Sequence, residues 1–127
     1  MMSISELPQV IHREAVKKVP KVWGHEEWIW NEQYCMKILV LRAGHASSYH
    51  YHKLKDEVFF VMKGRGRVFV SYADDELGAT PLDIEEGDSL HIPTGLRHTI
   101  IPITDLTLIE CSTHHSDDDS YRVNPGY

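Results

Sequence analysis

The 127-residue sequence predicts an all-β fold, either a sandwich or a small barrel. Short apolar or alternating runs rich in valine, isoleucine, phenylalanine and tyrosine recur at a spacing of roughly 8–12 residues. Glycine, proline and aspartate separate these runs and mark turns. No helix-period stretch of convincing length interrupts the pattern, so we expect strands joined by short turns throughout.

The first expected elements lie before residue 42. Residues 1–20 carry a weak amphipathic pattern that ends at Pro20, which predicts a short helix or an extended arm. The tryptophan-rich run 21–30 suits a strand, and 34–41 is an apolar strand interrupted by Lys37. Further strands are expected at 48–52, 57–63, 67–72, 80–85, 89–93, 98–103 and 106–112.

The connections divide the chain into three parts. Gly64-Arg65-Gly66 predicts a tight hairpin between 57–63 and 67–72. After the last strand, the polar and acidic segment 114–127 is expected to be a solvated tail, with a lid over a barrel mouth as the alternative. We therefore expect an N-terminal arm or short helix (1–20), a β-barrel (21–113) and a C-terminal polar tail (114–127).

Charge and composition exclude several classes of function. The net charge is −6 and no basic block stands out, so binding to nucleic acid or to an anionic membrane has no electrostatic support. No apolar run approaches the ~18 residues of a membrane span, and the N-terminus lacks the features of a secretory signal, so we expect a cytoplasmic protein. Cys35 and Cys111, both inside apolar runs, are expected to be reduced, buried thiols.

One stretch, residues 44–64, carries a histidine pair that points to metal binding. His50 and His52 stand two positions apart, and residues at that spacing on a strand face the same side. Glu57 opens the next strand. Two imidazoles and a carboxylate that converge from two strands are three ligands of a divalent-metal site. Surface histidines on an edge strand are the alternative.

A fourth ligand is expected from a second histidine-bearing stretch, residues 87–98. Pro93 and Gly95 form a tight turn that lets His98 begin a new strand directed back toward the sheet. If the barrel closes between the two stretches, this imidazole meets the other three side chains.

The two stretches together resemble the cupin superfamily. The first cupin motif, G-x5-H-x-H-x4-E-x6-G, is matched by Gly44, His50, His52, Glu57 and Gly64. The second, G-x5-P-x-G-x2-H-x3-N, is matched by Gly87, Pro93, Gly95 and His98, with Pro102 in place of the last residue. The resemblance implies a double-stranded β-helix, or jelly-roll, barrel and one divalent transition metal (Zn, Fe, Mn, Ni or Co) held by His50, His52, Glu57 and His98.

The flanks of these motifs are similar to the cupin domain of type II phosphomannose isomerases. The similarity lies in Trp23, Gly24 and Glu26 near the start and in Glu110, Asp119 and Arg122 near the end. It implies a sugar or sugar-phosphate isomerase or epimerase that uses the metal to polarise its small-molecule substrate. The family's habit of pairing barrels, with the tryptophan-rich strand, predicts a homodimer.

Four residues are candidates for the chemistry beyond the metal. Glu110 shares a strand face with apolar side chains, which favours a functional carboxylate over a structural ion pair; with His91 it is a candidate catalytic base. His91 as a rim histidine is the alternative. Lys37 and Arg122 are the candidate substrate-binding residues, although Lys37 could equally pair with a core carboxylate. A non-haem iron dioxygenase and a non-enzymatic sugar-binding or regulatory module are the alternative functions.

Overall fold

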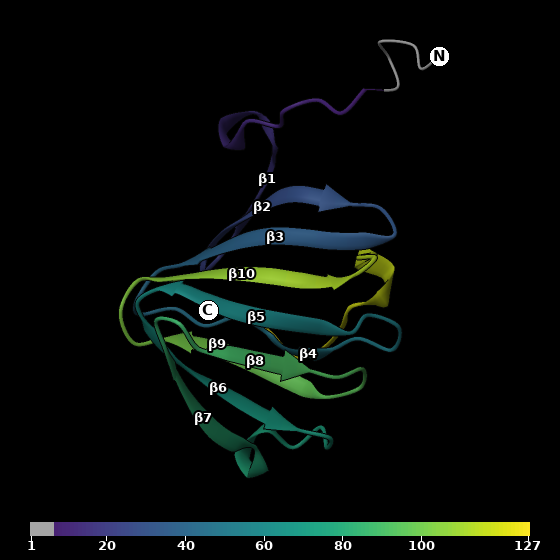
Figure 1. Cartoon of the computed structure of the whole chain (residues 1–127). Coiled ribbons are helices and arrows are strands. Elements are labelled where there is room, and N and C mark those ends of the chain that lie inside the picture. Colours follow the sequence, from purple (N-terminus) through teal and green to yellow (C-terminus); the bar gives the residue numbers. More distant parts are fainter. Residues whose placement is uncertain (1–6) are drawn as a thin grey trace.

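The computed structural model describes residues 7–127 as two antiparallel sheets packed face to face in a jelly roll (Figure 1). The first sheet has the order β1-β2-β3-β10-β5-β8 and the second β11-β4-β9-β6-β7. The strands are β1 (Lys17–Lys21), β2 (Gly24–Asn31), β3 (Tyr34–Leu41), β4 (Tyr49–Tyr51), β5 (Glu57–Lys63), β6 (Arg65–Ser71), β7 (Thr80–Glu85), β8 (Ser89–Ile92), β9 (Arg97–Pro102), β10 (Leu106–Thr113) and β11 (Tyr121–Asn124).

Helical structure within residues 7–127 is confined to short 3-10 turns. These are η2 (Arg13–Ala15), η3 (Glu76–Gly78) and η4 (Asp117–Asp119). Across this described part of the chain, no helix has the length and apolar character needed to cross a bilayer. The all-β jelly-roll prediction is confirmed.

The apolar core lies between the inner faces of the two sheets. Strand alternation produces it: on β10, Leu106 and Leu108 point inward and are fully buried, whereas Thr107 and Ile109 at the alternate positions face outward. Each large aliphatic side chain buried in this way contributes about 1.5–3 kcal/mol to folding. Because β10 lies between β3 and β5, its inward side chains are held by neighbours on both sides.

The predicted hairpin at residues 64–66 is wrong. Strand β5 belongs to the first sheet and β6 to the second, so the chain turns a corner between the sheets there. Gly64 makes the corner with a φ of 89°, and a Cβ at this position would collide with the backbone carbonyl of Asp105. Glycine is therefore required because the chain crosses to the opposite sheet within one residue.

Two edge strands lie outside the expected barrel. β1 pairs with β2, so the barrel begins before residue 21, and β11 pairs with β4, so residues 114–127 are not a solvated tail. The arm-or-helix expectation for 1–20 falls partly on residues 1–6, which lie outside the described residues. Residues 7–12 form no regular element and precede η2.

The two cysteines differ in exposure. Cys35 is 2% exposed and points into the barrel, as expected. Cys111 is exposed, so the prediction of two buried thiols is wrong for this residue. The strand period explains the error: Cys111 follows the inward Glu110 on β10 and therefore lies on the outer face of the sheet.

Candidate metal centre

A cavity of about 530 Å³ lies between the inner faces of the two sheets. Three histidines, on or next to strands of the second sheet, line it. His50 and His98 are direct register partners in the β4–β9 pair, and His52 follows β4 by one residue. Their ring centroids are 4.4 Å (His50 to His98) and 5.1 Å (His50 to His52) apart. Each offers a ring nitrogen within 4.8 Å of the other two, so the three histidines are positioned to bind a metal ion.

The other ring nitrogen of each histidine, Nδ1, is hydrogen-bonded to a backbone carbonyl. A carbonyl oxygen only accepts hydrogen bonds, so each Nδ1 must carry the proton and each Nε2 presents a lone pair to the cavity. Such outer contacts fix the tautomer and orientation of metal-binding imidazoles. The accepting carbonyls are those of Ser48 for His50 (2.9 Å), Asp119 for His52 (2.9 Å) and Leu96 for His98 (3.0 Å).

Glu57, the first residue of β5, brings a carboxylate from the opposite sheet. Its Oε1 lies 3.2 Å from Nε2 of His98, and its Oε2 lies 3.6 Å from Nε2 of His52. Within residues 7–127, the buried Nε2 of His98 has no hydrogen-bond partner. Two ligands bound at ~2.1 Å and at right angles around one ion stand ~3 Å apart. The unpartnered nitrogen and its 3.2 Å distance from Oε1 of Glu57 therefore fit a metal ion.

The protonation states also fit a metal. Burial, then the neighbouring His98 and His52, hold the pKa of His50 well below its usual value. Burial and the Lys55 ammonium lower the pKa of His52 to about 4. Burial opposes ionisation of Glu57, but His98 and Lys55 outweigh it and lower the pKa of this carboxyl. Neutral imidazoles and an ionised carboxylate are the forms that bind metals.

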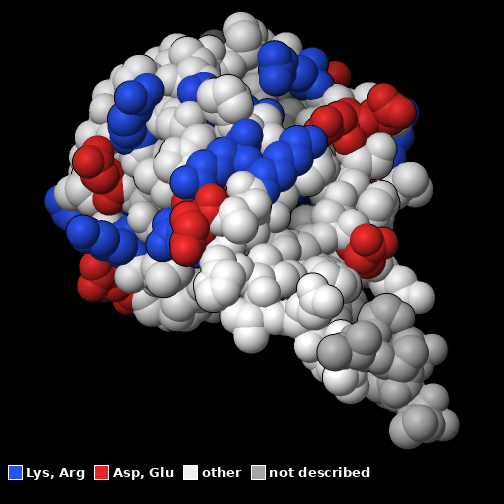
Figure 2. All heavy atoms as spheres, turned by 90° about the horizontal axis from the view of Figure 1, so that it is seen from above, with Lys and Arg blue, Asp and Glu red and all other residues white. Residues whose placement is uncertain are grey.

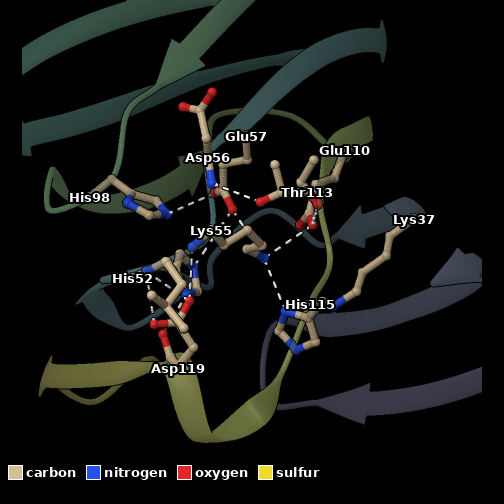
Figure 3. Close-up of polar contacts among 12 residues, drawn as sticks. Lys37, His52, Lys55, Asp56, Glu57, His98, Glu110, Thr113, His115 and Asp119 are labelled. Carbon is tan, nitrogen blue, oxygen red and sulfur yellow. Dashed lines mark hydrogen bonds and ion pairs between the residues drawn. The ribbon is translucent and has the colours of Figure 1, made fainter. Parts of the chain in front are cut away.

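Lys55 is a buried cation at the centre of the site that sequence reasoning missed. Its Nζ lies 3.0 Å from Oε2 of Glu57, 3.1 Å from Oε2 of Glu110 and 3.0 Å from Nδ1 of His115 (Figure 3). Burial disfavours the ammonium, but Glu110 and Glu57 reverse this and raise the pKa of Lys55. Lys55 therefore stays charged and links one prospective metal ligand to a second carboxylate.

Glu110 lies in the cavity, as the alternation of β10 predicted. It is 4% exposed and accepts a hydrogen bond from the Ser112 hydroxyl at 3.0 Å as well as from Lys55. Burial and the charge of Glu57 raise the pKa of Glu110, with Lys55 opposing. The carboxylates of Glu57 and Glu110 both contact Nζ of Lys55. Glu110 is therefore adjacent to the prospective metal ligands, but it is not itself part of the metal-binding group.

The two candidate substrate-binding residues also line the cavity. Lys37 is the register partner of Glu110 and is 1% exposed. Its Nζ lies 3.3 Å from Oε1 of Glu26 and 4.3 Å from the ring centroid of Trp28. Of the two roles expected for Lys37, substrate binding and pairing with a core carboxylate, the structure shows the ion pair. Arg122 on β11 is exposed at the cavity mouth, where its register partner is His50.

His91 lies elsewhere. It pairs in register with Val58, and both side chains face outward from the first sheet. Its side chain is 57% exposed and its Nε2 contacts Oδ1 of Asp56 at 2.7 Å. His91 is not among the residues that line the cavity, so the structure does not bring it to Glu110 and the metal-binding histidines.

The C-terminal segment closes one side of the site. Asp119, only 6% exposed, accepts hydrogen bonds from the backbone N–H groups of the loop 53–55 while its own carbonyl holds His52. Asn31 fixes the segment through two hydrogen bonds, accepting from the N–H of His115 at 2.8 Å and donating to its carbonyl at 2.9 Å. His115 is thereby buried against Lys55, a role that its polar sequence context concealed.

Comparison with known proteins agrees with this architecture. A family model of the cupin domain matches residues 37–111, more than half of the chain. The protein belongs to the cupin family. The cupin resemblance of the two sequence motifs is confirmed, and no curated protein sequence matches the chain.

Solved structures share the cupin fold. The capsular polysaccharide assembling protein CapF of Staphylococcus aureus is 19% identical, with a TM-score of 0.76 over 86% of this chain and 32% of that one. A variant of the oxalate decarboxylase of Bacillus subtilis is also 19% identical, with a TM-score of 0.74 over 94% of this chain and 34% of that one. This cupin spans about a third of each, and at these identities the likeness concerns the fold.

Proposed function

We propose that this cupin is a metal-dependent isomerase or epimerase that acts on a sugar or sugar phosphate. One observation carries the proposal: inside a single cavity, the ammonium of Lys55 joins Glu57, beside the metal-binding histidines, to Glu110, which stands apart from them. A metal site and a separate buried carboxylate, held side by side, are what a proton transfer next to a carbonyl group requires.

The metal would be held by His50, His52, His98 and Glu57. A four-ligand set of this kind leaves one or two positions open on a five- or six-coordinate ion, and it suits Zn, Fe, Mn, Ni or Co without choosing among them. When bound, the metal supplies Lewis-acid polarisation of a substrate carbonyl.

Glu110 is the proposed base. In an aldose–ketose interconversion, its carboxylate would take the proton from C2 and return it to C1 of the enediol, while the hydroxyl proton of O2 passes to O1. Lys55 and the Ser112 hydroxyl, at 3.1 and 3.0 Å from Oε2, fix the orientation of this carboxylate. His91 has no part in this scheme because it lies on the outer face of the sheet.

A cation at the cavity mouth supports an anionic substrate. Arg122 lines the mouth, whereas Lys21 and Lys37, which also line the cavity, pair with Glu26. Figure 2 shows lysine and arginine side chains, with aspartate and glutamate side chains among them, on the side of the molecule that faces up in Figure 1. Trp23, 7% exposed, adds an aromatic wall against which a sugar ring can pack. The printed role of CapF in capsular polysaccharide assembly is also a carbohydrate role. We further propose a cytoplasmic homodimer.

The test is proton exchange in deuterated water. Protein loaded in turn with Zn, Mn, Fe, Ni or Co is incubated with aldose and ketose phosphates, and deuterium incorporation at C2 or C1 is followed by NMR. We expect exchange with at least one metal and its loss in Glu110→Gln, while His91→Gln, a matched change outside the cavity, keeps it. Sugar-phosphate binding without exchange would instead indicate a non-enzymatic binding module. Oxygen consumption by the Fe(II)-loaded protein would indicate a dioxygenase.

A further inference from the structure

Four side chains form a continuous stack on the outer face of the second sheet. The rings of Tyr51 and Tyr121 are stacked, with their centroids 5.2 Å apart and their planes inclined by 22°. The guanidinium carbon of Arg97 lies 3.6 Å from the ring centroid of Tyr51, and Nζ of Lys53 lies 4.3 Å from that of Tyr121. Cations attract the faces of aromatic rings, so both tyrosine rings gain a favourable contact. We call these four residues the outer stack.

The outer stack joins three neighbouring strands. β4 lies between β9 and β11, and Tyr51 and Tyr121 are register partners in the β4–β11 pair. Arg97 is the first residue of β9, and Lys53 follows β4 by two residues. Tyr121 is 36% exposed and the Arg97 side chain 18%, so the stack is partly shielded from water. The three strands that it joins form the side of the cavity that carries the histidines.

The members of the outer stack alternate with the metal-binding histidines along the chain. Tyr51 stands between His50 and His52, and Arg97 immediately precedes His98. Neighbouring residues of a strand point to opposite faces of the sheet. The outer stack therefore lies directly behind the three imidazoles, on the same stretches of backbone.

The backbone pairing of β4 with β9 is short. Within residues 7–127, it consists of the single register pair His50–His98. In this antiparallel register the residue after His50 stands opposite the residue before His98, and these residues are Tyr51 and Arg97. Their cation–π contact thus continues the pairing where the backbone ladder has ended. It helps to fix the separation of the two strands that carry His50 and His98.

Arg97 also connects the stack to the turn before His98. Its Nε donates a hydrogen bond to Oδ1 of Asp74 at 2.9 Å, and another guanidinium nitrogen donates to the carbonyl of Gly95, also at 2.9 Å. The N–H of Gly95 in turn donates to the carbonyl of His52 at 2.7 Å. One guanidinium is therefore linked to the backbone next to two of the three histidines.

Tyr121 connects the stack to the C-terminal segment. It is the first residue of β11, an edge strand of four residues that pairs with β4. Two residues earlier, the carbonyl of Asp119 accepts the hydrogen bond from Nδ1 of His52. Stacking of Tyr121 on Tyr51 therefore supports the strand that follows this carbonyl.

We propose that the outer stack positions the three histidines for metal binding, with Tyr51 and Arg97 as the main positioning residues. The inference rests on the proposed metal centre and adds residues that lie on the other face of the sheet and touch no metal. Ligands must be held within about 0.5 Å of their productive positions by the structure around them. With one backbone register pair between β4 and β9, the contacts of Tyr51 and Arg97 supply much of this constraint.

The experiment is a Co²⁺ titration of the apo protein, read from the ligand-field spectrum. We expect Tyr51→Leu, which removes the ring from the stack, to weaken Co²⁺ binding ~10-fold and to change the spectrum of the bound ion. Tyr51→Phe keeps the ring and should restore both to the wild-type values. Tyr34→Leu, at a tyrosine 65% exposed on the first sheet, is the matched control and should change neither.

Arg97→Gln tests the same contact from its other side and preserves both aromatic rings. We expect it to weaken Co²⁺ binding by ~2–5-fold, since it removes the cation above Tyr51. Urea unfolding of the metal-free proteins measures the contribution of the stack to folding separately. This second measurement distinguishes loss of stability from loss of ligand geometry.

The outcomes separate this inference from the metal centre on which it rests. A wild-type protein that binds Co²⁺, beside folded Tyr51→Leu and Arg97→Gln variants with the wild-type affinity and spectrum, would overturn the inference alone, even if both variants unfold more easily. A folded wild-type protein that binds no Co²⁺ would overturn the metal centre and this inference with it.

Discussion

The two halves of the barrel interior use the same strands for opposite purposes. Along the inner side of β10, Leu106 and Leu108 are followed by Glu110, and along β3, Leu41 and Leu39 are followed by Lys37. All six side chains are at most 5% exposed. One half is an ordinary apolar core, and the other buries carboxylates, ammonium groups and imidazoles at comparable depth.

This difference separates what holds the fold from what carries the chemistry. The apolar half contributes folding energy through burial alone. The polar half costs energy unless each charge is compensated, and Lys55 provides that compensation for two carboxylates at once. A protein that needed only stability would gain by filling this half with apolar side chains, so its composition reflects function.

Lys55→Met tests the polar half with the largest expected loss of stability. The change leaves Glu57 and Glu110 buried without their shared cation, which costs ~3–5 kcal/mol in the metal-free protein. Urea unfolding with and without bound metal measures the effect. Metal should restore part of the loss because it neutralises Glu57; an unchanged free energy of unfolding in the metal-free variant would contradict the role given to Lys55.

Leu108→Ala tests the apolar half. Removal of this fully buried side chain should lower the free energy of unfolding by ~2–5 kcal/mol, through lost burial and a new cavity. Metal stoichiometry, measured on the folded variant by elemental analysis, should stay as in the wild type. Loss of metal from this variant would show that the two halves are not separable.

Asp119→Asn tests how the C-terminal segment supports the metal ligands. The carboxylate orders loop 53–55, which joins His52 to Lys55, so we expect metal affinity to fall ~10–100-fold. Titration of the apo protein with Co²⁺, read from the ligand-field spectrum, measures both affinity and geometry. Asp118→Asn, at the neighbouring position, is the control and should change neither.

The smallest expected effect lies on the outer side of the sheet. The Arg13 hydrogen bond lowers the pKa of Glu27 from 4.5 to about 2, with burial opposing and His25 assisting. A carboxyl whose pKa is lower in the folded state stabilises the protein above pH 4.5, and this stability is lost as the pH falls from 4.5 toward 2. Arg13 is 57% exposed, so the contribution is below ~1 kcal/mol. The unfolding temperature of Glu27→Gln should fall less steeply than that of the wild type as the pH is lowered from 4.5 toward 2. An equally steep fall in both proteins would contradict the assignment.

The sequence predicted those parts of the site that depend on local pattern. The common face of His50 and His52 and the inward position of Glu110 follow from the strand period, and the turn before His98 follows from Pro93 and Gly95. The structure brings these histidines and Glu110 to one cavity. Most strand boundaries followed from the same period.

The missed features depend on partners distant in the chain. Lys55 is buried only because Glu110 and His115 meet it from the C-terminal region, and no local pattern distinguishes it from the exposed Lys53. Strands β1 and β11 pair through their backbones, so their polar sequences carry little signal. The sheet-crossing corner at Gly64 and a hairpin need the same residue type, so sequence could not distinguish them.

In the proposed metal centre, three histidines and one carboxylate of the polar half hold a catalytic metal. Elemental analysis of the purified wild-type protein and of the double variant His50→Ala, His98→Ala measures whether they do. We predict one transition-metal ion per wild-type chain and none in the double variant, with the variant still folded by circular dichroism. Undiminished metal in the double variant, or a folded wild-type protein that binds no transition metal when supplied with it, would contradict the claim.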